Sequence, residues 1–244
     1  MKQLARIYRL LLSLRYRVTL EGTEVLRGEE PLLILPNHQA TVDPQLLYAH
    51  LYRYTVAFPL VSEMYTRIGI LKPLFKQMGA IPVPDLERGR SGVEEASRLD
   101  RIVLNALREG RNMLIYPAGQ LASQGYEKIY NKQTAWKVCR ELPAGTRVIG
   151  VCIRGLWGSM WSRARNGRSP DFLTTYLKGI FYVLANLIFF LPRRRVSIHF
   201  HDITDSALQR ATEGRQLFNH CLESFYNAAG EEEALFLKHF FFKP

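Results

Sequence analysis

Short apolar runs alternate with amphipathic segments along most of the chain. The apolar or alternating runs predict strands at residues 17–21, 31–36, 79–84, 112–116, 147–153 and 196–201. Helical spacing predicts helices at 46–54, 71–78, 91–109, 132–141 and 213–228, the last burying Leu217, Phe218, Cys221, Leu222 and Phe225. Strands that alternate with helices predict an α/β fold, here a single domain (1–244) with a mainly parallel central sheet flanked by helices.

Two further segments combine apolar side chains with arginines. Residues 1–17 place Leu, Ile and Tyr at helical spacing among basic residues, which predicts an N-terminal basic amphipathic helix. Residues 172–195 end in three arginines, but their cleanest apolar run extends only from Ile180 to Leu191. A bilayer span needs about twenty such residues. Both segments therefore suit a membrane interface, and burial against the core is the alternative for each.

Composition narrows the class of partner. The chain has 244 residues, 47% of them hydrophobic, which excludes disorder, and a formal net charge of +11, which favours a polyanionic partner. Basic clusters flank apolar surface, so an anionic membrane surface is favoured and nucleic acid is not expected. Cys139, Cys152 and Cys221 lie far apart and show no disulfide or metal spacing. We expect no metal or cofactor, and a peripheral, monotopic protein on the cytoplasmic face of the membrane.

A His and an Asp separated by four residues follow the apolar run 31–36. The pattern predicts Asp43 at the N-cap and Pro44 at the first helical position of the next helix. The chain turns back here and brings His38 beside the Asp43 carboxylate. That contact would fix the tautomer of His38 and make it a candidate general base for a hydroxyl. A capping Asp and a structural His explain the same residues, so other segments must decide.

Four features follow one another along the chain: His38 to Asp43, Gly79-Ala-Ile-Pro-Val83, the strand and turn Tyr116-Pro-Ala-Gly119, and the strand 147–153. Their order and spacing resemble the four sequence blocks of the glycerolipid (1-acyl-glycerol-3-phosphate and lysophospholipid) acyltransferase family. The resemblance covers roughly residues 15–202. It implies an O-acyltransferase that moves a fatty acyl chain from a thioester, acyl-CoA or acyl-acyl carrier protein, to a lysophospholipid-type hydroxyl.

The resemblance also implies roles for particular residues. His38 is the base that deprotonates the acceptor hydroxyl, and Asp43 orients it. Such a reaction needs a base and an oxyanion stabiliser but no acyl-enzyme. The residues expected to bind the acceptor are Asn37, Pro117, Ala118, Gly119, Gln120, Arg88, Arg90 and Arg154.

Two C-terminal segments narrow the resemblance further. Residues 154–159 and 227–242 are most similar to the acyltransferase domain of bifunctional acyltransferase/acyl-acyl carrier protein synthetases. An adenylate-forming, acyl-activating partner is therefore also expected.

The chain departs from the family pattern where the acceptor's phosphate is expected to bind. Asp85 stands in place of an Arg in the second block, and Ala118 in place of a Glu in the third. Gln120 and Leu121 supply no cation there, and Gly150 replaces a Pro in the fourth block. Arg88, Arg90 and Arg154 are candidates to replace the missing cations, or else they are solvated surface residues.

These departures keep a second class of function open. A non-catalytic module that binds lipid or acyl carrier protein would need the same fold and the same basic surface, without the phosphate-binding residues. Acyl transfer to a broad panel of acceptors separates this module from an enzyme.

Overall fold

The strands form one sheet whose spatial order differs from their order along the chain. The computed structural model describes residues 2–63, 75–76, 79–83, 92–186, 190 and 192–238. Its strands are β1 (Tyr16–Glu21), β2 (Leu32–Pro36), β3 (Ala57–Ser62), β4 (Ile81–Val83), β5 (Asn112–Leu114), β6 (Arg147–Arg154) and β7 (Arg194–Asp202). Across the sheet they run β1-β7-β6-β2-β5-β3-β4. Every neighbouring pair is parallel except β6 and β7, so the expected mainly parallel sheet is confirmed.

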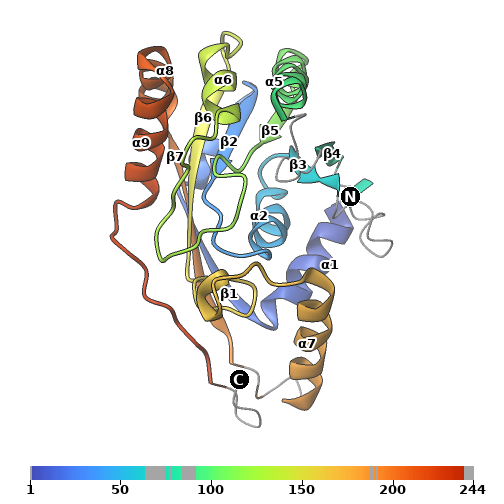
Figure 1. The fold of residues 1–244 in the computed structure, drawn as a ribbon. Helices are drawn as coiled ribbons and strands as arrows, with labels where there is room; N and C mark the ends of the chain where they lie inside the picture. The colour runs from blue at the N-terminus through green and yellow to red at the C-terminus, as the bar shows by residue number, and fades with distance from the viewer. Residues whose placement is uncertain are drawn as a thin grey trace.

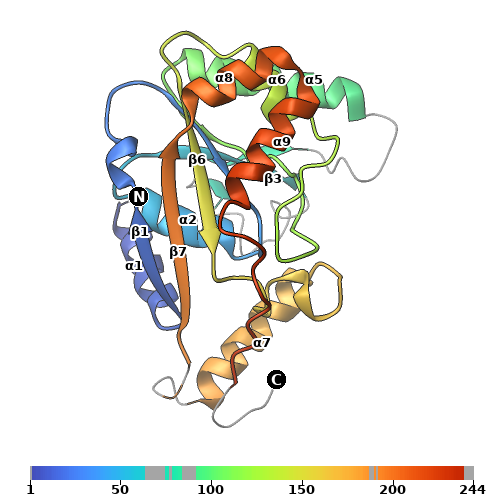
Figure 2. The same cartoon turned by 90° about the vertical axis from the view of Figure 1, so that its left-hand side faces the viewer.

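Helices cover both faces of this sheet (Figures 1 and 2). They are α1 (Lys2–Ser13), α2 (Asp43–Leu51), α5 (Gly92–Arg108), α6 (Thr134–Arg140), α7 (Phe172–Ala185), α8 (Thr204–Glu213) and α9 (Arg215–Tyr226). Short 3₁₀ turns lie at Thr23–Leu26 and Arg163–Arg165. The predicted α/β class and the N-terminal helix are therefore both confirmed.

β2 lies at the centre of the sheet, and all five of its residues are buried. Leu32 and Ile34 point to one face and pack in the cluster that includes side chains of α2. Leu33 and Leu35 point to the other face, where α5, α6, α8 and α9 complete a second cluster. Burial on both faces explains why the strand reads as a continuous apolar run without alternation. The residues that follow β2 are thereby attached to the buried centre of the sheet.

Two elements are missing from the sequence-based prediction. β3 contains Pro59, which lacks a backbone N–H and weakens a strand assignment from sequence. α8 has few large apolar residues, because it packs on the sheet mainly through Ala207 and Ala211. Small contacts of this kind give a weak periodic signal.

Other boundaries shift. The helix expected to reach residue 54 ends at Leu51, and α9 leaves Leu217 49% exposed, although this side chain was expected in the core. The predicted helix 71–78 lies outside the described residues except for Phe75 and Lys76, which are helical. Residue 91, the expected first residue of the helix 91–109, also lies outside them.

Gly150 has a packing reason in this fold. A Cβ on this β6 residue would lie 2.7 Å from a ring carbon of Phe225 on α9 and 3.0 Å from Ile203. The absence of a side chain therefore lets α9 approach the sheet closely. This explains the departure from the family's Pro at this position.

The second apolar segment forms α7 over its first part, ending at Ala185. Within the residues that the structure describes, no helix combines the length and the apolar character needed to cross a bilayer.

Candidate active site

His38 and Asp43 meet at the carboxyl end of β2, where parallel α/β sheets place their ligands. His38 lies in the loop after β2, and Asp43 is the first residue of α2. His38 Nδ1 lies 3.2 Å from Asp43 Oδ2. The Asp43 side chain is fully buried, whereas that of His38 is 17% exposed. The ring therefore has a fixed inner end and an outer end within reach of a substrate.

The Asp43 carboxylate does not cap α2, contrary to the sequence-based expectation. The N-cap is Val42, and no side chain caps this helix end. Asp43 Oδ2 instead accepts hydrogen bonds from the backbone N–H of Gln39 (2.6 Å) and of Ala40 (3.0 Å). A buried carboxylate needs such donors, and the tight loop supplies them. Burial raises the pKa of Asp43, while His38 and the two amides favour the charged form.

Asn37 ties the start of this loop to the neighbouring strand. Its Oδ1 accepts from the Ile153 amide (2.7 Å), and its Nδ2 donates to the Ile153 carbonyl (2.9 Å). Both polar atoms of the side chain therefore face β6. The structure places Asn37, expected to bind the acceptor, where it holds the loop in position.

The third-block turn flanks His38 on two sides. The ring of Tyr116 packs on the ring of His38 with centroids 4.3 Å apart, and the Ala122 amide donates to the His38 carbonyl at 2.7 Å. Gly119 N–H closes the turn on the Tyr116 carbonyl, and a Pro at position 117 has no N–H to offer. Within the described parts of the chain, the amides of Ala118 and Gln120 make no hydrogen bond. These two remain the candidate donors to a ligand.

The structure brings one unexpected cation to this turn. Lys132 belongs to a distant loop, yet its Nζ lies 3.9 Å from where a Cβ on Gly119 would stand. Asn219 Nδ2 fixes this loop by donating to the carbonyls of Lys132 and Tyr130, both at 2.9 Å. No carboxylate among the described residues forms an ion pair with Lys132.

Of the three arginines proposed to replace the family's cations, the structure describes only Arg154. Arg88 and Arg90 lie outside the described residues, as does Asp85. Arg154 ends β6, and its guanidinium contacts the C-terminal tail, donating from Nη1 to the Gly230 carbonyl at 3.0 Å.

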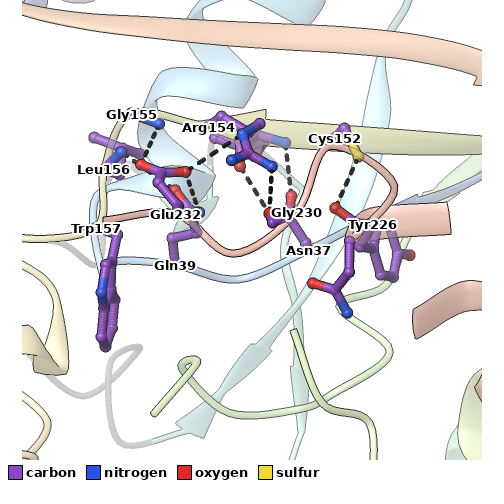
Figure 3. Close-up of polar contacts among 12 residues, drawn as sticks. Asn37, Gln39, Cys152, Arg154, Gly155, Leu156, Trp157, Tyr226, Gly230 and Glu232 are labelled. Atoms are coloured by element: carbon purple, nitrogen blue, oxygen red, sulfur yellow. Dashed lines mark hydrogen bonds and ion pairs between the residues drawn. The ribbon is translucent and has the colours of Figure 1, made fainter. Parts of the chain in front are cut away.

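The C-terminal tail, residues 227–238, passes the loop after β2 and the segment after β6, and Glu232 contacts both (Figure 3). Glu232 accepts hydrogen bonds from Gln39 Nε2 (2.8 Å) and from the Gly155 amide (2.8 Å). Gln39 Oε1 in turn accepts from the Leu156 amide at 3.2 Å. Further along, Leu235 accepts from the buried guanidinium of Arg194. The tail thus joins the His38 loop to the segment after β6.

A second buried carboxyl group lies beside the pair. Glu127 is 3% exposed, and its Oε2 accepts from the backbone N–H of His38 at 3.0 Å. Burial, with the negative charges of Asp43 and Glu223 nearby, raises the pKa of Glu127 to about 8. Asn227 holds its backbone through hydrogen bonds of 2.8 and 2.9 Å.

Sequence reasoning missed Tyr116, Glu127, Lys132 and Glu232 as neighbours of the site. Residues 117–131 show no periodicity, so nothing indicates a role for Glu127, and Lys132 is predicted only as the start of the helix 132–141, which begins at Thr134 instead. Glu232 carried a signal, because residues 231–233 are an acidic triplet in a strongly basic chain.

Two further histidines, His199 and His201, lie on β7. His199 Nδ1 lies 3.4 Å from Glu21 Oε2, and His201 meets Phe225 edge-on. Among the described residues, no group of three or more His, Cys, Asp or Glu is arranged to hold a metal ion.

Glu127 generates a prediction for pH dependence. Its pKa is about 8 in the folded protein and about 4.5 when exposed, so the folded state keeps a proton that the unfolded chain loses. Stability therefore falls as pH rises through this window. Glu127→Gln keeps an oxygen for the His38 amide but cannot ionise, so we expect a flatter curve and higher stability than wild type at pH 8. Urea unfolding at several pH values measures this.

The exposed Glu109→Gln serves as the control and should follow the wild-type curve. Parallel curves for wild type and Glu127→Gln would show that Glu127 does not titrate as described.

Comparisons with known proteins agree with this architecture. The sequence model of the family described as Acyltransferase matches residues 17–154, more than half of the chain. A search of curated proteins found no match. Among solved structures, the 1-acyl-sn-glycerophosphate (LPA) acyltransferase PlsC from Thermotoga maritima superposes with a TM-score of 0.59 and 14% sequence identity. The alignment covers 93% of this chain and 77% of that chain, and at this identity the likeness concerns the fold.

The matched region contains β1 from its second residue, β2 through β6, and both members of the His38–Asp43 pair. The order of the sequence blocks, the parallel sheet and the family match all lead to one assignment. The chain is an acyltransferase and belongs to the glycerolipid acyltransferase family.

Proposed function

We propose that this enzyme transfers a fatty acyl chain from a thioester to the hydroxyl of a lysophospholipid, with His38 as general base. The observation that carries the proposal is the contact between His38 Nδ1 and the buried carboxylate of Asp43. The contact favours the tautomer with the proton on Nδ1, which leaves Nε2 free to accept one. Asp43 also stabilises the imidazolium that forms when His38 takes the hydroxyl proton.

The chemistry needs only one proton shuttle. His38 Nε2 accepts the hydroxyl proton while the oxygen attacks the thioester carbonyl, and the carbonyl oxygen becomes an oxyanion. The amides of Ala118 and Gln120, in the turn that flanks His38, are candidate donors to this charge. When the intermediate collapses, the C–S bond breaks and the imidazolium returns its proton to the leaving thiolate. The products are an ester and a free thiol.

The acceptor class follows from the turn beside His38. The PlsC structure is named for an acceptor with a phosphate, 1-acyl-sn-glycerophosphate. In this chain Lys132 stands beside the turn without a carboxylate partner among the described residues. A lysophospholipid phosphate would supply the missing charge, as a point-like ammonium binds phosphate well. We therefore assign to Lys132 the phosphate contact that Ala118 and Leu121 do not provide.

Substitution of His38 tests the mechanism. His38→Ala should lower acyl transfer to a lysophospholipid by about 10²- to 10⁴-fold, the usual contribution of a general base. The measurement follows labelled acyl chains from acyl-CoA and from acyl-acyl carrier protein to mixed lysolipids by mass spectrometry. His220→Ala, an exposed His on α9, is the matched control and should keep wild-type activity.

Retained turnover in His38→Ala would overturn the mechanism. Wild-type protein that binds lipid or carrier protein tightly but transfers no acyl chain would favour the non-catalytic module instead.

The proposal includes contact with an anionic membrane through α1 and α7. Large apolar side chains on both helices face solvent: Ile7, Leu10, Leu11, Leu173, Leu177, Ile180, Phe181 and Leu184. Burial raises the pKa of Tyr8 on α1, and the charge of Tyr176 on α7 adds to this effect. Exposed apolar surface of this extent marks an interaction site.

Arginines border this apolar surface. A hollow of about 920 Å³ between α1 and the edge of the sheet is lined by Arg6, Arg9, Arg53 and Arg193 together with Ile7 and Leu10. In a membrane, the apolar side chains would contact the acyl chains of lipids, and the neighbouring guanidinium groups would contact the phosphate headgroups.

Replacing one leucine on each helix tests the membrane contact. Leu10→Ser with Leu177→Ser should weaken binding to phosphatidylglycerol vesicles by about tenfold or more, because each buried Leu contributes about 1.5 kcal/mol or more. Vesicle co-sedimentation measures the change. Leu217→Ser on α9, which replaces another exposed leucine on the far face of the sheet, should bind as wild type does. Equal binding by all three proteins would contradict the assignment.

A further inference from the structure

A basic hollow lies at the same edge of the sheet as His38 but on neighbouring strands. It measures about 400 Å³ and is lined by Arg17 of β1, Arg195 of β7 and Arg154 at the end of β6. Thr19 and Ser197, which carry hydroxyl groups, line it as well, and the Thr19 hydroxyl donates to the Val196 carbonyl at 3.4 Å. β6 is parallel to β2, so Arg154 and His38 both follow the carboxyl ends of their strands.

The three guanidinium groups lack sufficient countercharge. Arg17 and Arg195 are direct partners in the parallel ladder between β1 and β7. Like charges at facing positions of a sheet repel and destabilise it. Among the described residues, neither has a carboxylate within ion-pair distance, and Arg154 has only Glu232, at 3.7 Å. The fold therefore maintains an uncompensated positive site that an anion would stabilise.

The donor groups in the hollow match phosphate. Guanidinium presents a planar fork of N–H donors that fits phosphate oxygens in pairs, and hydroxyls add single hydrogen bonds. Several arginines around one small hollow suit a ligand with more than one phosphate.

The position of the hollow relates it to acyl transfer. Its wall at Gly155 is held by Glu232, which also binds Gln39, the neighbour of His38. From β2 to β7 there are two strand spacings, or about 10 Å. The pantetheine arm of an acyl thioester contains as many bonds as about four extended residues, which span about 14 Å. A phosphate in the hollow and a thioester at His38 therefore fit one ligand.

We infer that the hollow of Arg17, Arg154 and Arg195 binds the phosphates of a CoA thioester, the acyl donor. The inference rests on the proposed acyl transfer at His38 and assigns its donor. Arg17 and Arg195 also line the larger hollow beside α1, so lipid phosphate is the competing source of the same chemistry.

Binding of CoA itself, measured by calorimetry on the full chain, tests the inference without any turnover. Arg195→Ala and Arg17→Ala should each raise the Kd for CoA by about tenfold, the loss expected for one charge-assisted contact. Pantetheine, which lacks phosphate, should bind weakly to all proteins. Arg195→Lys should lie between wild type and Arg195→Ala.

Two controls isolate the hollow. The control variants are Arg53→Ala and Arg108→Ala. Arg53 lines only the larger hollow, and Arg108 is exposed at the end of α5. Both should bind CoA as wild type does. The same variants titrated with phosphatidylglycerol vesicles give the lipid comparison, and circular dichroism checks that each variant is folded.

Three results would overturn the inference. The first is no saturable CoA binding by wild type, and the second is a CoA affinity in the Arg17 and Arg195 variants equal to that of wild type. The third is that these variants lose vesicle binding but keep CoA binding. His38→Ala separates this test from the proposed function, because it should bind CoA normally. If CoA binds at the hollow and His38→Ala still transfers acyl chains, the role of His38 as general base is refuted, but the assignment of the hollow to CoA is not.

Discussion

The site depends on one buried carboxylate. Asp43 Oδ2 accepts hydrogen bonds from the backbone N–H groups of Gln39 and Ala40 and also faces His38 Nδ1. A single oxygen therefore fixes both the loop backbone and the imidazole ring. Placing a carboxylate in a fully buried position is costly unless such donors surround it. The central β2 strand, buried on both faces, provides the rigid base on which this loop is built.

Contacts from distant parts of the chain complete the edge where His38 lies. Asn37 ties the loop to β6, Tyr116 covers one face of the ring, and Glu232 links Gln39 to the segment after β6. The tail also packs tightly on the chain at Gly125, because a Cβ there would lie 2.1 Å from the Glu232 carbonyl oxygen. Residues separated by about two hundred positions therefore act on one loop.

The sequence predicted the elements with strong local patterns and missed those set by tertiary contacts. The apolar run of β2, the heavily periodic α5 and the His38–Asp43 spacing were readable because each signal lies within one segment. β3 with its Pro59 and α8 with its small contact residues carried weak signals. Asp43 was read as a helix cap from its neighbour Pro44, but the loop amides compete for its carboxylate. Lys132 and Glu127 reach the site only through the folded loop, so no spacing could reveal them.

The central claim is that Asp43 holds the proton of neutral His38 on Nδ1 and leaves Nε2 as the base. Long-range ¹H–¹⁵N NMR of the labelled enzyme reports the position of this proton directly. We expect a protonated Nδ1 and a bare Nε2 for His38, with a mixture of tautomers in Asp43→Asn. A proton on Nε2 in the wild-type enzyme, or an unchanged tautomer in the variant, would contradict it.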